Sequence, residues 1–147
     1  STPAIKAARE KATVALEVLL PAVYLEALDL ACYRIDPELT PEFRKRLLLY
    51  FLHRCAGDPS AARQLATLLG EAGPAFREGE AAALRRRFSL KVSPAVSSEI
   101  GRLMTMSGLN KTKLIKALVL LVERDVIAPE QPLALSELRR LAAVATG

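Results

Sequence analysis

Residues 87–94 read Arg87-Phe88-Ser89-Leu90-Lys91-Val92-Ser93-Pro94. The first six alternate strictly between polar and apolar side chains, which is typical of a β-strand with one buried face. We expect Phe88, Leu90 and Val92 to face a core and the polar side chains between them to point outward. Serine followed by proline indicates a helix N-terminus, because serine can cap and proline lacks an N–H that the first turn would leave unpaired. The strand should therefore lead directly into a helix.

The residues that follow predict two helices joined by a tight turn. Apolar residues recur at helical spacing at Val96, Ile100, Leu103 and Met104. Gly108 can adopt the left-handed conformation that ends a helix, and Asn110 can cap the next one. Residues 117–122 of that second helix are apolar on every face, so the helix should be buried nearly all round. A unit of about forty residues is too small to bury such a helix alone, so it needs a partner of similar shape.

The positive charge of the chain is concentrated in the same region. The 147 residues include 21 Lys or Arg and 16 Asp or Glu, a formal net charge of +5. Residues 85–116 hold eight of the cations against one acid, a net of +7, whereas the other thirteen cations and fifteen acids net −2. Such a patch favours a polyanionic partner, although a solvated basic surface without a ligand would have the same composition.

The composition excludes several classes of protein. An apolar fraction of 51% is too high for a disordered chain. The longest apolar runs, residues 47–52 and 117–122, are far shorter than the ~20 residues of a membrane span. Charged residues interrupt any signal-peptide pattern near the N-terminus. Cys32 and Cys55 lack CxxC spacing, which argues against a disulfide framework and a thiolate zinc site. We expect a cytoplasmic protein without a membrane segment.

No constellation of residues predicts catalysis. The sequence contains no GxGxxG, GxxxxGK[ST], HExxH or GxSxG pattern. His53 stands beside Cys55, but no further ligand lies at metal-binding spacing, so a surface histidine near a helix C-terminus is the simpler interpretation. The other expected core residues are Cys32 and the aromatic side chains Tyr24, Tyr33, Tyr50, Phe43, Phe51 and Phe76. We expect no enzyme activity, no cofactor and no metal.

The succession of strand, helix, glycine-containing turn and buried second helix resembles the ribbon-helix-helix (MetJ/Arc-type) family of DNA-binding proteins. The resemblance rests on residues 87–92, on Ser93-Pro94 and on residues 107–112. Members of that family pair two copies, so that their strands form an antiparallel ribbon that enters the major groove. The resemblance implies that Arg87, Ser89 and Lys91 read base edges, for which these side chains are suited. It also implies phosphate contacts at the start of the second helix and beside the strand, by Asn110, Lys111, Thr112, Lys113, Arg85 and Arg86.

The N-terminal third repeats the pattern. Residues 12–20 alternate, with Val14, Leu16, Val18 and Leu20 on one face. Pro21-Ala22-Val23 aligns with Pro94-Ala95-Val96, and residues 47–52 align with residues 117–122. Thr40-Pro41-Glu42 is a further helix start, at which Thr40 would contact phosphate.

The outer strand face of this first copy differs from that of the second. It offers Lys11, Thr13, Ala15 and Glu17. We expect Lys11, Thr13 and Glu17 to face the groove, where the glutamate could accept from cytosine N4 but would weaken binding near phosphates. The ribbon is therefore expected to be asymmetric, and its DNA site need not be palindromic.

We predict a mainly α-helical fold with one short two-stranded antiparallel ribbon, built as a tandem ribbon-helix-helix pseudo-dimer. Residues 1–54 and 86–125 are the repeats, residues 55–85 a helical linker, and residues 126–147 a tail with a short helix at 136–141. The chain resembles the relaxosome accessory proteins of conjugative plasmids. Two alternatives remain open. The second repeat could pair with its twin on another chain while the first third forms a helical oligomerisation domain, or residues 96–122 could form a helix-turn-helix, which leaves the alternation at 87–92 unexplained.

The predicted function is sequence-specific binding of double-stranded DNA, as a bacterial transcriptional regulator or a plasmid-transfer accessory protein. Other DNA-processing proteins are candidate partners, and the chain would act as a monomer or as a higher assembly on DNA. The alternative is a non-enzymatic helical interaction module whose basic segment contacts an acidic protein. The discriminating feature is the strand: if residues 85–92 continue a helix from Glu78, the groove-reading surface disappears.

Overall fold

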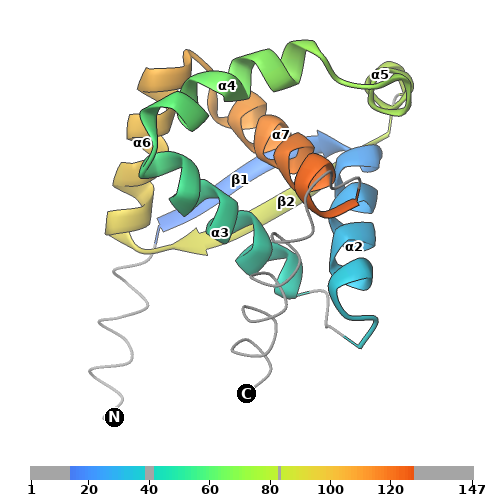
Figure 1. The fold of residues 1–147 in the computed structure, drawn as a ribbon. Coiled ribbons are helices and arrows are strands. Elements are labelled where there is room, and N and C mark those ends of the chain that lie inside the picture. The colour runs from blue at the N-terminus through green and yellow to red at the C-terminus, as the bar shows by residue number, and fades with distance from the viewer. Residues whose placement is uncertain (1–13, 39–41, 83, 128–147) are drawn as a thin grey trace, which may run out of the picture.

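The computed structural model describes residues 14–38, 42–82 and 84–127. Within them the chain forms strand β1 (Val14–Pro21), helices α2 (Ala22–Ile35), α3 (Phe43–Ala56), α4 (Pro59–Gly70) and α5 (Pro74–Ala81), strand β2 (Arg85–Val92), helices α6 (Pro94–Ser107) and α7 (Lys111–Val122), and a π-helical turn η1 (Glu123–Ile127). This part of the chain is mainly helical, with one two-stranded antiparallel sheet, as predicted (Figure 1). The helix expected at residues 136–141 lies outside the described residues.

The two strands are far apart in the sequence and adjacent in space. Leu16 lies opposite Leu90, and Val18 lies opposite Phe88. Because opposite residues share a face, one face of the ribbon collects the buried side chains of Leu16, Val18, Leu20, Phe88, Leu90 and Val92. Val14 lies opposite Val92 at the end of the ribbon and shares this face, but it is 42% exposed. Helix α5 ends at Ala81, and residues 85–92 form a strand rather than a continued helix.

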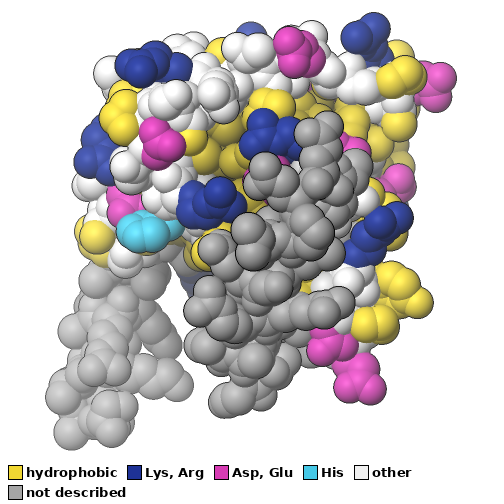
Figure 2. Space-filling model, viewed as in Figure 1, with side chains coloured by type: hydrophobic (Ala, Val, Ile, Leu, Met, Phe, Trp, Pro, Cys, Tyr) yellow, Lys and Arg dark blue, Asp and Glu magenta, His cyan; other side chains and the backbone are white. Residues whose placement is uncertain are grey.

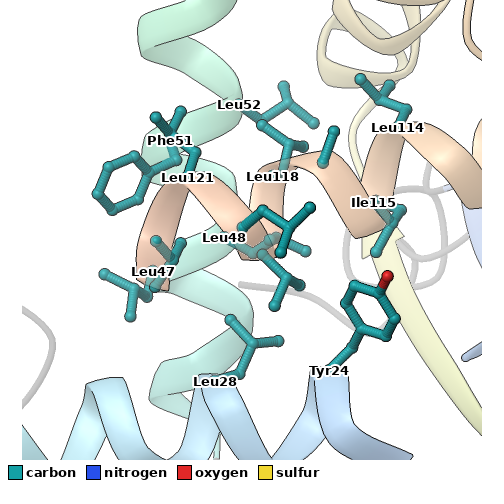
Figure 3. Packing of buried hydrophobic residues seen from close by; sticks show 14 of the residues in the cluster. Tyr24, Leu28, Leu47, Leu48, Phe51, Leu52, Leu114, Ile115, Leu118 and Leu121 are labelled. Carbon is teal, nitrogen blue, oxygen red and sulfur yellow. The ribbon is translucent and has the colours of Figure 1, made fainter. Parts of the chain in front are cut away.

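Helix α7 is the centre of the core. Eight of its residues are buried, including every residue from Ala117 to Val122, as the sequence predicts. It packs against β1, α2, α3 and α4. Leu118 and Leu121 lie close to apolar side chains of α3, and Ile115 lies close to Tyr24 of α2 (Figure 3). The first half of the chain therefore supplies much of the apolar surface that this helix requires.

The two halves of the chain pack on each other reciprocally. Helices α2 and α6 each have 14 residues and each follow a strand directly. Helix α2 packs against α7, and α6 packs against α3. Arg102 of α6 donates to the carbonyl of Ala56 at the end of α3 (2.8 Å), and Arg34 of α2 donates to the carbonyl of Ile127 at the end of η1 (2.8 Å). In both cases an arginine of one half donates a hydrogen bond to a backbone carbonyl at the C-terminal end of a helix of the other half.

The strand-to-helix junctions of the two halves match with an offset one residue different from that of the sequence alignment. Pro21 is the N-cap of α2, whereas Pro94 is the first residue of α6 and Ser93 is its N-cap. Pro21 therefore corresponds to Ser93, and Ala22 corresponds to Pro94. This register aligns Leu16 with the buried Phe88, whereas the match of Pro21 with Pro94 aligned it with the polar Ser89. The proline match was wrong because the extended φ and ψ at Pro21, −53° and 141°, suit a strand end as well as a cap.

The turn and cap residues of the second half behave as predicted. The Ser93 hydroxyl accepts from the amide of Val96 (3.2 Å). Gly108 ends α6 with a φ of 72°, in the left-handed region that favours glycine. The side-chain oxygen of Asn110 accepts from the amide of Lys113 at the start of α7 (2.9 Å). These local interactions fix the direction in which α7 leaves the turn.

The linker helices cover the two halves of the chain. Helix α4 buries Ala62 and Leu65 and packs on α3, α6 and α7. Helix α5 packs on α2, where the ring of Phe76 lies 5.2 Å from that of Tyr24. Both helices lie within the segment 55–85 that was predicted as a helical linker. This segment is therefore part of the core and fixes where β2 begins.

Gly79 allows α5 to approach α2 closely. A Cβ at this position would overlap Cγ1 of Val23 and lie 2.7 Å from its Cβ. We expect Gly79→Ala to lower the free energy of unfolding by about 1–3 kcal/mol, the usual cost of overpacking, as measured by urea unfolding. The control is Gly101→Ala in α6, where a Cβ meets nothing within 4 Å and alanine should add about 0.5–1 kcal/mol of stability. Equal effects of the two substitutions would contradict the close approach.

Candidate nucleic-acid interface

One face of the ribbon is exposed and carries the predicted base-reading side chains. The register places Arg87 opposite Leu19, Ser89 opposite Glu17, and Lys91 opposite Ala15. Ser89 is half-buried and the other five residues are exposed. We call these six residues the outer ribbon face. Lys11 and Thr13, which were predicted to extend it, lie outside the described residues.

The outer ribbon face has a cation on each side of its centre. Arg87 and Lys91 are four residues apart on β2, or roughly 13 Å along the strand. Neither takes part in an ion pair within the described part of the chain. Glu17 and Ser89 lie between them on opposite strands. On the face of the molecule seen in Figure 2, basic and acidic side chains are likewise interspersed.

Leu19 is a member of the outer ribbon face that the sequence reasoning did not use. Its side chain is 59% exposed and stands across the ribbon from Arg87. Directly opposite Cβ atoms in an antiparallel pair are about 4.5–5.5 Å apart, so the two side chains leave the ribbon side by side. The alternation of residues 12–20 already placed Leu19 outward, and an apolar residue at an outward position was the signal that could have identified it.

Arg85 and Arg86 were both predicted to contact phosphate, and their surroundings differ. The Arg85 guanidinium donates to the carbonyls of Ala82 (3.0 Å) and Glu80 (3.1 Å) and lies 3.8 Å from the Glu80 carboxylate. It is therefore engaged at the C-terminal end of α5. Arg86 is exposed, and its guanidinium forms no hydrogen bond or ion pair within the described residues. Arg86 is consequently the freer of the two cations.

Glu80 connects four elements around the start of β2. The Tyr24 hydroxyl donates to its Oε1 (3.0 Å), and Nζ of Lys116 lies 2.7 Å from the same oxygen. Burial alone would raise the pKa of Glu80, but the hydrogen bonds from Lys116 and Tyr24 and the charges of Lys116 and Arg85 outweigh it, so this pKa is lowered. Burial, followed by the hydrogen bond to Glu80, raises the pKa of Tyr24. The carboxylate thus ties α2, α5 and α7 to the first residue of the strand.

We expect Glu80→Gln to destabilise the protein at pH 7, because it removes the charge that Lys116 and Arg85 neutralise. The pKa of Glu80 is lower in the folded chain than its unfolded value of about 4.3, so its stabilisation is present above that value and is lost as the pH falls through the folded pKa. Urea unfolding should therefore separate the variant from the wild type at pH 7 and bring them together in acid. Glu71→Gln removes an exposed carboxylate outside this network and serves as the control. A difference between Glu80→Gln and the wild type that persists unchanged in acid would contradict the assignment.

The first turn of α7 presents amides and cations together. The side-chain oxygen of Asn110 accepts a hydrogen bond from the amide of Lys113. The backbone carbonyl of Asn110 accepts one from the amide of Leu114. The amides of Lys111 and Thr112 have no partner among the hydrogen bonds of the described residues, as is usual for the first turn of a helix. Both Lys111 and Lys113 are exposed. This arrangement can bind one anionic oxygen group. Thr40, the corresponding prediction in the first half, lies outside the described residues.

The fold accounts for His53 and for the two cysteines. Nδ1 of His53, an exposed side chain, lies 3.3 Å from the carboxylate of Glu99 across the α3–α6 contact. Burial raises the pKa of Cys32 to about 12 and also raises that of Cys55, so both thiols stay protonated and unreactive at neutral pH. Tyr33 is 63% exposed, so its predicted place in the core was wrong. Its position on α2 follows the helical spacing but faces away from α7.

Three further observations concern metal binding, membrane spanning and similarity to known proteins. Among the residues described here, no three His, Cys, Asp or Glu side chains gather as they would around a metal ion. Within the same ranges, every helix is too short or too polar to cross a bilayer. Comparison with family models, with curated proteins and with solved structures found no match to this chain.

Proposed function

We propose that the protein binds double-stranded DNA sequence-specifically by inserting the β1–β2 ribbon into the major groove. The register of the two strands carries the proposal, because it directs Arg87 and Lys91 to an exposed surface while their apolar neighbours are buried. A two-stranded ribbon fits the width of the major groove, and both cations can donate to guanine O6 and N7. The protein would serve as a transcriptional regulator or as a plasmid-transfer accessory protein in the cytoplasm.

The proposal includes a tandem ribbon-helix-helix pseudo-dimer within one chain. Its support is the reciprocal packing of α2 on α7 and of α6 on α3, with β1 and β2 paired between them. The arginine contacts of Arg34 and Arg102 to the opposite half add to it. In this arrangement the ribbon reads bases, and the first turn of α7 positions the protein on a phosphate.

The test combines the solution mass of the free protein with a footprint on duplex DNA selected from a random pool. The expected result is a monomer that protects a short site in the major groove, with affinity falling as salt rises because counterions are released. An obligate dimer would favour the alternative in which β2 pairs with a second chain. Failure to select any duplex, together with equal weak binding to all sequences, would overturn the proposal.

Leu19 should add specificity for thymine. Apolar side chains in the major groove contact the thymine C5-methyl group. Replacing the thymines of the selected site one at a time with deoxyuridine should therefore weaken binding of the wild type at one position. Leu19→Ala should bind the two forms of that position equally. Ala15 lies at the other end of the ribbon face, and Ala15→Gly should retain the response to deoxyuridine. A wild type that ignores every substitution would contradict the contact.

A further inference from the structure

A cavity of about 490 Å³ lies between α2, α5, α7 and the end of α4. Its volume is within the range of small-molecule sites, which is roughly 300–1,000 Å³. No residue of either strand lines it, so it is separate from the outer ribbon face. Of its lining residues, the proposed function uses only Lys113, in the first turn of α7.

One wall of the cavity is apolar. It is formed by the rings of Tyr24 and Phe76, tilted by 46° with centroids 5.2 Å apart, and by the side chain of Leu69. Tyr24 and Phe76 are almost completely buried, so the fold holds both rings in place. Little of either ring is therefore accessible, and the apolar surface open to a ligand comes mainly from the half-buried side chains of Leu69 and Ala72 beside Phe76.

The rest of the lining is mainly positively charged. Arg77, Lys113 and Lys116 contribute to it together with one carboxylate, that of Glu80. Glu80 already accepts from Lys116 and Tyr24, so its charge is neutralised within the lining. Arg77 uses its Nε for the carbonyl of Ala72 (3.0 Å), which leaves its terminal nitrogens as donors. Lys113 forms no ion pair within the described residues. Two cations are therefore available to an anionic group.

We propose that this cavity binds a small amphiphilic anion, in which an aromatic or branched apolar group carries a carboxylate or a phosphate. The apolar group would lie against Leu69, Ala72 and the accessible edge of Phe76, and the anion would accept from Arg77 and Lys113. Both parts are needed, because the apolar side chains alone offer no fixed polar partner and the two cations alone are exposed to water. Lys113 also lies in the first turn of α7, where the proposed function places a phosphate contact, so the two sites share this cation. Ligand binding is measured without a duplex, so its failure is distinguishable from a failure of DNA binding.

The test uses three probes on the full chain: 2-naphthoate, the neutral 2-naphthalenemethanol and inorganic phosphate. Binding is measured by ligand-observed NMR and by calorimetry. We expect 2-naphthoate to bind at least about tenfold more tightly than the alcohol, which lacks charge-assisted hydrogen bonds, and more tightly than phosphate, which lacks the apolar contact. Equal binding of the acid and the alcohol, tighter binding of phosphate, or no binding of any probe would overturn the proposal.

Variants locate the binding within the cavity. Leu69→Trp should fill it and abolish 2-naphthoate binding, and Lys113→Ala should weaken binding about tenfold. Arg63→Ala, which removes an exposed cation of α4 that does not line the cavity, should have no effect. If Leu69→Trp fails to fold, the comparison of Lys113→Ala with Arg63→Ala decides. Binding that responds equally to both of these substitutions would place the anion elsewhere on the surface and overturn the assignment.

Discussion

Replacement of Leu118 by alanine is expected to lower the free energy of unfolding by about 2–5 kcal/mol, as for other fully buried leucines. Leu118 is completely buried in α7, the helix that contacts both halves of the chain. Domains of this size are commonly stable by only about 5–15 kcal/mol, so the substitution removes a large fraction of the total. Urea unfolding followed by circular dichroism measures the change.

The matched control for Leu118 is Leu30 in α2, which is 44% exposed. Leu30→Ala should change stability by no more than about 0.5 kcal/mol. Because α7 packs on helices from the first half, we also expect one unfolding transition rather than two. Two separate transitions, or similar effects of both substitutions, would contradict the shared core.

Arg87→Ala should weaken binding to the selected DNA by about 1–3 kcal/mol, or roughly 5- to 150-fold, and relax the preference at one base pair. Arg87 is the exposed cation nearest Leu19 on the outer ribbon face, and it has no ion pair among the described residues that would compete with a base. The loss should be seen on the selected sequence and be much smaller on random duplex. Fluorescence anisotropy with both duplexes at one salt concentration measures it.

Lys111→Ala provides the contrast to Arg87→Ala. It removes a cation from the first turn of α7, so binding to all sequences should weaken alike, and the slope of log K against log salt should become shallower by about one. Arg63→Ala, on the linker helix α4, should leave both affinities unchanged. If Arg87→Ala and Lys111→Ala caused equal losses on selected and random duplexes, the division into base-reading and phosphate contacts would be wrong.

Local signals were sufficient to predict the second half of the fold. The alternation at 87–92, the cap at Ser93 and the glycine at position 108 each act over a few residues, and the structure has a strand, a helix start and a left-handed turn at these positions. The uninterrupted apolar run of α7 also predicted its burial. For the candidate site, the same alternation placed Arg87, Ser89 and Lys91 on one exposed or half-buried face.

Features that depend on contacts between distant segments could not be predicted in this way. Glu80 engages Tyr24, Lys116 and Arg85, and nothing in the local sequence around residue 80 indicates these partners. The one-residue shift between the repeats arose because a proline can end a strand or begin a helix, and only the pairing of β1 with β2 distinguishes the two. Tyr33 was assigned to the core because it follows the helical spacing of apolar residues. That spacing does not show how much of the helix surface the neighbouring helices cover, and Tyr33 lies on the exposed part.

The covalent connection between β1 and β2 has a consequence for how the protein responds to dilution. Proteins that assemble a ribbon from two identical subunits lose it when their concentration falls below the dimer dissociation constant. Here the strands are joined through α2 to α5, so each is always present beside the other at a high local concentration. A cell that holds only a few molecules of this protein would still have the ribbon assembled in every one of them.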